Sequence, residues 1–224
     1  MHINSLLLFE KYAKKFFKDD MRILEIGPNS FPSNYKESVK NYSISWDTID
    51  LFPNDNLTYL AINEYKFPIE DNYYDIVLSG QVIEHVRKIW IWVKEISRVC
   101  KMGGLVITIN PISYPFHKIP YDCWRIYPEG MKALYEDAGL KVILSVFNSL
   151  EQVKLRQRGF RNIIPGKSCP PEALMGFSLY LRNLGKNVFK PKLFFRFLLT
   201  YIKKLVGWPI NCSFDTITIG KKVI

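Results

Sequence analysis

The stretch ILEIGPNS at residues 23–30 decides the fold class, because it reads as a buried β-strand that ends in a tight turn. Glu25 stands near the end of this strand, and Gly27 follows in the turn. Such a turn exposes backbone N–H groups to a ligand at the carboxyl edge of a parallel sheet. The residues after Gly27, from Pro28 through Phe31 to Pro32, include none of the further glycines that the dinucleotide motif GxGxxG would need, so a diphosphate ligand is not expected.

Around this strand, short β-branched runs alternate with polar or amphipathic stretches, which is typical of βαβ units and a mostly parallel sheet. Asp50 ends the second expected strand, where its carboxylate can accept both hydroxyls of a ribose, as an adenosine-type ligand requires. The expected strands are 22–26, 42–49, 57–62, 74–79, 105–109, 141–147 and 213–219. Helices are expected at about 6–17, 84–100 and 128–139.

Four stretches resemble the class I S-adenosylmethionine-dependent methyltransferases, specifically the small type-11 group. They are ILEIGPNS, the strand ending at Asp50, FPIEDNYYDIVLSGQVIEHV (67–86) and EISRVCKMGGLVITINP (95–111). They occur in the family's order over more than half of the chain. The resemblance implies an α/β fold: a Rossmann-like seven-stranded sheet of order 3-2-1-4-5-7-6 with helices on both faces. Strands 141–147 and 213–219 then pair antiparallel at one edge.

S-adenosylmethionine is the cofactor that this resemblance implies. Glu25 and Gly27 match the positions near its methionine amino group, Asp50 the ribose position, and Asn63 the position near the adenine amine. The family motif normally carries three glycines, whereas this chain keeps only Gly27; Asn29 can take positive φ at modest cost, which would preserve the turn. The complete set of implied cofactor-binding residues is Glu25, Gly27, Asn29, Asp50, Leu51, Asn63, Ser79, Gly80 and Gln81.

The loop after the fifth strand gathers side chains suited to holding a methyl acceptor. We expect His117 to act as a catalytic base, and Asp122 to serve either as base or as the group that orients it. Tyr121, Trp124 and Arg125 are the expected substrate-binding residues. The alternative is that Trp124 and Arg125 only pack the loop against the next helix while His117 is solvated.

His85 is a third candidate for catalysis, since it follows Glu84 in the motif stretch that ends at Val86. The alternative is an ordinary helix start, in which Glu84 faces the positive end of the helix dipole and His85 forms a first-turn hydrogen bond. The four cysteines form no CxxC pair, and the sequence predicts no metal-ligand set.

The pattern His-x-x-Pro-x-Asp-x-Trp-Arg at 117–125 also resembles type-11 methyltransferases of bacterial surface-glycan pathways. The leading hypothesis is therefore O-methylation of a sugar or glycan precursor, lipid- or phosphate-linked. One alternative is an RNA methyltransferase, a weaker reading because Asn110-Pro111 follows the fifth strand, whereas the motif of amino-methylating enzymes follows the fourth. Another is a cofactor-binding scaffold without activity.

The charge is concentrated in residues 149–211, which hold twelve basic and two acidic side chains and account for the whole net charge of +10. We interpret the chain as one domain, 1–224, with 149–211 as a basic helical insert between strands six and seven. Helices are expected at 170–185 and 191–207. The second is amphipathic and, at about 22 Å, is too short to cross a bilayer of about 30 Å. Its apolar arc packs on the body or a second copy in a homodimer, or lies on an anionic membrane.

No segment has the length and composition of a signal h-region or a transmembrane helix. The sequence therefore predicts a cytoplasmic protein with reduced cysteines, peripheral at the inner membrane if the insert binds lipid.

Overall fold

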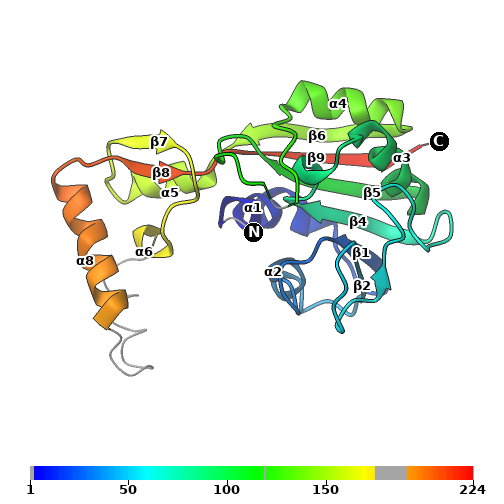
Figure 1. The fold of residues 1–224 in the computed structure, drawn as a ribbon. Coiled ribbons are helices and arrows are strands. Elements are labelled where there is room, and N and C mark those ends of the chain that lie inside the picture. The colour runs from blue at the N-terminus through cyan, green and yellow to red at the C-terminus, as the bar shows by residue number, and fades with distance from the viewer. Residues whose placement is uncertain (1–2, 119, 175–190, 224) are drawn as a thin grey trace.

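A computed structural model of the chain describes residues 3–118, 120–174 and 191–223. Its centre is a seven-stranded sheet of order β3-β2-β1-β4-β5-β9-β6 (Figure 1). The strands are β1 (Arg22–Ile26), β2 (Ser45–Asp50), β3 (Tyr59–Leu60), β4 (Tyr74–Gly80), β5 (Cys100–Pro111), β6 (Leu140–Asn148) and β9 (Asp215–Lys222). With β9 as the seventh strand of the sheet, this order confirms the predicted topology.

The strand directions also follow the prediction. β2, β1, β4 and β5 run parallel in neighbouring pairs, and β3 pairs parallel with the end of β2. β9 runs antiparallel between β5 and β6, with Thr218 opposite Thr108 on one side and Ser145 on the other. The carboxyl ends of β1, β2, β4 and β5 therefore meet at one edge, where a ligand site of this fold is built.

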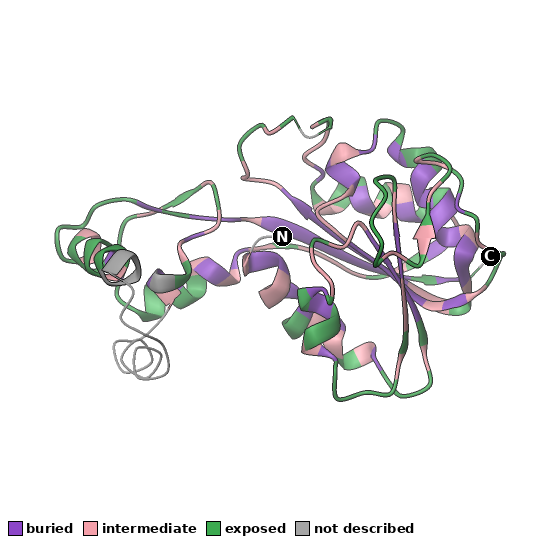
Figure 2. Ribbon diagram, turned by 60° about the horizontal axis from the view of Figure 1, so that its bottom comes forward, coloured by how far each residue is buried: buried purple, intermediate pink, exposed green. Residues whose placement is uncertain are grey.

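Helices cover both faces of the sheet. On one face, α3 (Ile89–Val99) and α4 (Pro128–Asp137) bury Trp92, Met131 and Tyr135. On the other, the N-terminal segment and α2 (Asn34–Ser38) bury Phe9 and Tyr35. The buried residues follow the sheet and the helix faces turned toward it (Figure 2). The apolar runs in the sequence thus become two cores separated by the sheet.

The N-terminal segment is less regular than the single helix expected at 6–17. α1 spans Ile3–Leu8, a π-helical turn follows at Phe9–Ala13, and a 3₁₀ turn at Lys14–Phe16. α2 was not among the expected helices. It begins where Ser33 accepts the N–H of Lys36 at 3.1 Å, which is ordinary N-capping.

The helix expected at 84–100 begins five residues later, at Ile89. Residues Ile83–His85 instead form a 3₁₀ turn. The carbonyl of Glu84 accepts the N–H of Cys123 at 2.8 Å, and the carbonyl of Val86 accepts the indole N–H of Trp124 at 2.8 Å. Because the loop after β5 occupies these two carbonyls, they are not available to an α-helical ladder, and Glu84 and His85 face that loop.

β5 also begins earlier than expected, at Cys100 rather than Leu105. Gly103, at φ +78°, and Gly104 were interpreted as a helix stop, yet the strand runs through them. A Cβ on Gly104 would stand 2.8 Å from the carbonyl oxygen of Asp75 in β4, so close strand pairing requires glycine there.

The insert forms a lobe beside the sheet (Figure 1), with a small apolar cluster that includes Leu155, Phe160 and Cys212. Of the helix expected at 170–185, only the first turn falls within the described residues; the helix expected at 191–207 is confirmed as α8. Among the described residues, no helix has the length and hydropathy needed to cross a membrane. The elements of the lobe are α5 (Leu150–Gln157), β7 (Ile163–Pro165), α6 (Pro171–Leu174), α8 (Pro191–Leu205) and β8 (Ile210–Cys212).

Candidate active site

The end of β1 holds a buried carboxylate. Glu25 is 2% exposed, and its Oε2 accepts the hydroxyl of Ser33 at 2.6 Å and the indole N–H of Trp46 at 2.9 Å. Burial raises the pKa of Glu25 to about 7, against the two hydrogen bonds, which lower it. Neither bond uses Oε1, which leaves that oxygen as the acceptor for a ligand donor.

The turn after β1 depends on one glycine. Gly27 has φ +66°, and a Cβ there would stand 2.5 Å from a methyl carbon of Val82. Asn29 is exposed and is not among the residues with positive φ, so the turn does not use the conformation that asparagine allows there. Because Gly27 alone provides the left-handed conformation, the missing second and third motif glycines are not needed for this turn.

At the end of β2, Asp50 is half-buried, and its Oδ1 accepts the N–H groups of Leu51 at 2.6 Å and Phe52 at 3.2 Å. These two hydrogen bonds fix the side chain in an Asx-type turn, and the other carboxylate oxygen, Oδ2, takes part in neither of them. Asn63 lies in an exposed turn, where its amide oxygen accepts the N–H of Tyr65 at 2.8 Å.

At the end of β4, Ser79 is buried, and Gly80 lies directly under the ring of Tyr35. A Cβ on Gly80 would come within 2.2 Å of the Tyr35 hydroxyl oxygen. Gln81 has φ +62°, and its amide nitrogen donates to the Ser5 hydroxyl at 2.6 Å. The amide oxygen of Gln81 is buried and has no hydrogen-bond partner among the described residues.

The loop after β5 is organised by an ion pair. The Asp122 carboxylate is 1% exposed and accepts the Arg125 guanidinium at 2.8 Å and the backbone N–H of His117 at 2.8 Å. Arg125 also donates to the carbonyl of Tyr114 at 3.1 and 3.2 Å. The hydrogen bond from Arg125 lowers the pKa of Asp122 to about 2. An acid ionised at every working pH is a poor base, so the structure favours the orienting role for Asp122.

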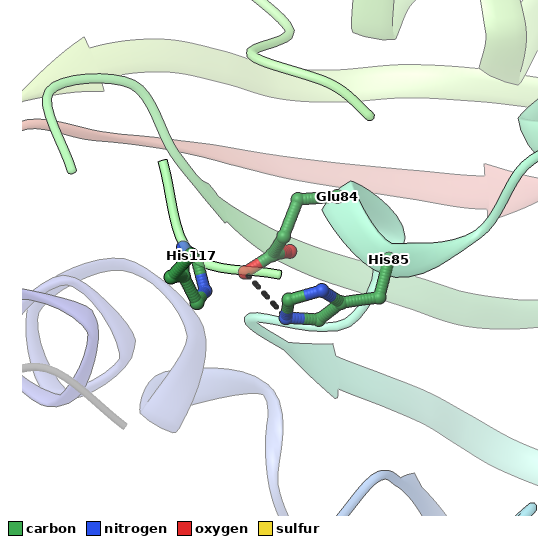
Figure 3. A group of neighbouring side chains, drawn as sticks. All are labelled: Glu84, His85 and His117. Atoms are coloured by element: carbon green, nitrogen blue, oxygen red, sulfur yellow. Dashed lines mark ion pairs between the residues drawn. The ribbon is translucent and has the colours of Figure 1, made fainter. Parts of the chain in front are cut away.

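His85 and His117 meet at the carboxyl end of β4, with ring centroids 5.0 Å apart (Figure 3). Glu84 lies between them, 1% exposed, with one carboxylate oxygen 3.8 Å from Nε2 of His85. Burial raises the pKa of Glu84 to about 8. The second oxygen has no hydrogen-bond partner among the described residues. Although Glu84 was expected only at a helix start, its burial brings it into this group.

The predicted substrate-binding residues divide into two groups. Arg125 and Trp124 are occupied inside the protein, Arg125 by Asp122 and Trp124 by the carbonyl of Val86. Tyr121 is 38% exposed, and Arg87 lies over its ring at 4.8 Å. Tyr121 therefore remains the best placed of the three to meet a substrate.

Comparison with known proteins agrees with the fold. Residues 36–108 match the methyltransferase domain family. Over 38% of its length, the chain is 33% identical to the ubiquinone/menaquinone biosynthesis C-methyltransferase UbiE of Rhizobium rhizogenes. That match covers 34% of the relative, so the chain spans about a third of the length of the curated relatives it matches.

Two solved structures share the architecture over nearly the whole chain. The [4+2]-cyclase SpnF has a TM-score of 0.56 at 13% identity, covering 98% of this chain and 81% of its own. Phosphoethanolamine N-methyltransferase 2 of Haemonchus contortus, solved with S-adenosylhomocysteine, has a TM-score of 0.54 at 13% identity, covering 97% and 52%. The strand order is that of the Rossmann-like fold of class I S-adenosylmethionine-dependent methyltransferases, and the segment 36–108 matches the methyltransferase domain family.

Proposed function

We propose that the protein transfers a methyl group from S-adenosylmethionine to a hydroxyl oxygen of a sugar or glycan precursor. The observation that supports this reaction is the cluster of Glu84, His85 and His117 beside the end of β4, because a hydroxyl is a poor nucleophile and needs such groups near it. Fold alone does not choose a reaction, since SpnF is a cyclase.

The residues at the strand ends fit the cofactor. Gly27 closes the turn after β1, and the amide oxygen of Gln81 is a buried acceptor without a partner among the described residues. Oε1 of Glu25 suits the methionine ammonium, and Oδ2 of Asp50 suits a ribose hydroxyl. When bound, S-adenosylmethionine supplies the methyl group; its S–C bond breaks with the electron pair left on sulfur as the acceptor oxygen forms the new bond.

The chain's own residues then have to position the acceptor and remove its proton. Asp122 and Arg125 hold the loop that carries His117, so the imidazole is presented at a fixed place. Nδ1 of His117 lies 3.2 Å from the carbonyl oxygen of Pro115, which can only accept, so Nε2 keeps its lone pair in the neutral ring. That lone pair can take or guide the hydroxyl proton.

Replacing Asp50 by alanine should weaken S-adenosylmethionine binding by about 1.5–3 kcal/mol, or roughly 10- to 150-fold, because a charged hydrogen bond to the ribose is lost. Calorimetric titration measures the change, with Asp55→Ala in the following exposed loop as control. Equal affinity in Asp50→Ala and wild type would remove Asp50 from the cofactor site.

Labelled S-adenosylmethionine and a panel of acceptors test the reaction itself. We expect label in a sugar or glycan hydroxyl. Label in RNA would favour the RNA methyltransferase, and label on carbon of a quinone-type ring would favour a reaction like that in the name of the Rhizobium rhizogenes relative. Cofactor binding without transfer to any acceptor would support the scaffold.

We also propose that the insert brings the enzyme to an anionic membrane surface, where a lipid-linked acceptor would lie. Helix α8 turns its apolar arc outward: Phe195 is 65% exposed, Leu199 56% and Leu205 68%. Arg196 and Lys203 line a cavity of about 310 Å³ with Lys167, and none of the described residues that line it is acidic. Because the outward face is apolar and the cavity is cationic, a lipid surface with phosphate headgroups complements both.

Co-sedimentation with anionic liposomes tests this location. Intact protein should sediment at low salt and less at high salt, and neutralising Arg196, Lys203 and Lys204 to glutamine should weaken binding by about 1 kcal/mol per charge. Lys40, Lys94 and Lys132 changed together to glutamine serve as the matched control. Should all three proteins sediment alike at every salt concentration, or not at all, the apolar arc belongs to a dimer interface instead.

A further inference from the structure

Three potential metal ligands converge where the loop after β5 meets the end of β4. Glu84 and His85 come from the 3₁₀ turn, and His117 comes from the loop 32 residues further on. One ligand atom from each lies within 4.8 Å of the other two (Figure 3). Two imidazoles and a carboxylate form a common ligand set for divalent metals.

Both imidazoles are held in the tautomer that a metal requires. Nδ1 of His85 contacts the carbonyl oxygen of Tyr121, and Nδ1 of His117 lies 3.2 Å from the carbonyl oxygen of Pro115. A carbonyl oxygen only accepts, so each Nδ1 carries the proton and each Nε2 offers a lone pair. Asp122 adds a carboxylate oxygen 3.2 Å from Nδ1 of His117. Oxygen acceptors behind ligand histidines are the usual outer contacts of metal sites.

Among the described residues, the carboxylate of the group is paired only with the imidazole of His85, at 3.8 Å. Glu84 is 1% exposed, and one of its oxygens is without a hydrogen-bond partner among the described residues. The nearby Arg125 gives its side-chain donors to Asp122 and to backbone carbonyls. A buried carboxylate oxygen without a partner is costly, and a cation between Glu84 and the two histidines would satisfy it.

We propose that Glu84, His85 and His117 bind one divalent transition-metal ion, of the zinc, cobalt or manganese kind, that holds the acceptor hydroxyl. Magnesium and calcium prefer all-oxygen ligand sets, so the two nitrogens favour a transition metal. Three protein ligands leave a position open, and a hydroxyl bound there loses its proton to water at lower pH. The inference revises the expectation of no metal site and gives the Nε2 lone pair of His117 to the metal instead of to the hydroxyl proton. It deepens the proposed function, on which it rests for the hydroxyl.

The present spacing predicts a small closure. Ligands bonded at about 2.1 Å to one tetrahedral ion lie about 3.4 Å apart, closer than the 4.8 Å that bounds the three atoms here. His117 sits on the loop while Glu84 and His85 sit beside the sheet, so the loop is the part that moves. Metal binding should therefore slow amide hydrogen exchange in residues 114–118 more than in β4.

Metal titration of chelator-stripped protein tests the site without reference to activity. We expect one Co²⁺ per chain, detected by calorimetry and by visible absorption of a nitrogen-bound ion. Glu84→Gln, His85→Ala and His117→Ala should each lower the Co²⁺ affinity about 100-fold or more. The controls are His2→Ala, at the one histidine of the sequence outside the cluster, and Glu129→Gln, at an exposed glutamate. Cys123→Ser in every protein removes the exposed thiol as a competing ligand.

Absence of Co²⁺, Zn²⁺ and Mn²⁺ binding by the stripped protein would overturn the site, as would equal affinity in folded His117→Ala and wild type. Circular dichroism melting verifies that each variant folds. The outcomes for the proposed function are separate. Methyl transfer at full rate in the chelator-treated enzyme would reject the metal and keep the transferase, whereas metal binding without any cofactor binding would keep the metal and reject the transferase.

Discussion

Replacing His117 by alanine is expected to slow methyl transfer by about 10²–10⁴-fold while S-adenosylmethionine affinity stays unchanged. The imidazole faces His85 and Glu84 on the acceptor side, whereas the expected cofactor contacts lie at the ends of β1, β2 and β4. Loss of the side chain therefore affects handling of the hydroxyl and spares the methionine and ribose contacts. Single-turnover kinetics measures the rate, and calorimetry measures the affinity.

His117→Gln provides a polar variant of similar reach, and His2→Ala provides the matched control. If His117 acts as a base alone, added metal changes neither the wild-type rate nor the variant rate. If it is a metal ligand, raising the Co²⁺ concentration restores part of the rate in His117→Ala, because Glu84 and His85 remain. A full-rate His117→Ala enzyme would remove His117 from the mechanism and leave His85 as the candidate.

The sheet could be predicted because its signal is local. The run Ile23–Ile26 is apolar apart from Glu25, and such runs form buried strands wherever turns bound them. α4 begins at Pro128 and is followed by Gly139, as its terminal residues predicted. The order of the strands came from the family resemblance, which implied a last strand placed between the fifth and the sixth.

The helix expected from Glu84 failed because its boundary depends on a distant segment. Trp90 and Val93 continue the helical spacing, but the carbonyls of Glu84 and Val86 bond to the loop around Cys123 and Trp124. The periodicity of apolar residues carries no information about those hydrogen bonds, which join residues more than 35 positions apart in the sequence. The same contacts turn Glu84 and His85 toward His117.

The site was predicted residue by residue rather than as a group. His85 and His117 were named for separate reasons, and nothing local says that their rings meet at 5.0 Å. Glu84 was missed because its 1% exposure is a tertiary property. Arg125 was assigned to substrate, although a buried Asp122 three positions earlier is its partner. Two opposite charges three positions apart in a loop could have been interpreted as an ion pair within the loop.

Replacing Glu151 by alanine is expected to lower the free energy of unfolding by about 3–9 kcal/mol. Glu151 is fully buried at the start of α5 and accepts the backbone N–H groups of Asn4, Cys169 and Ser213, each at 2.9 Å. Each donor left buried without a partner costs about 1–3 kcal/mol. Since a domain of this size is stable by about 5–15 kcal/mol, the change removes a large share.

The Glu151→Ala variant also tests how the insert is attached to the rest of the protein. Asn4 belongs to α1, Cys169 to the insert and Ser213 to the chain entering β9, so one carboxylate joins three segments far apart in sequence. Urea unfolding followed by tryptophan fluorescence should show one transition in wild type and an earlier midpoint in Glu151→Ala. Glu136→Ala, an exposed glutamate on α4, serves as control. A loss of stability below 1 kcal/mol would mean that this carboxylate does not fix the insert to the rest of the protein.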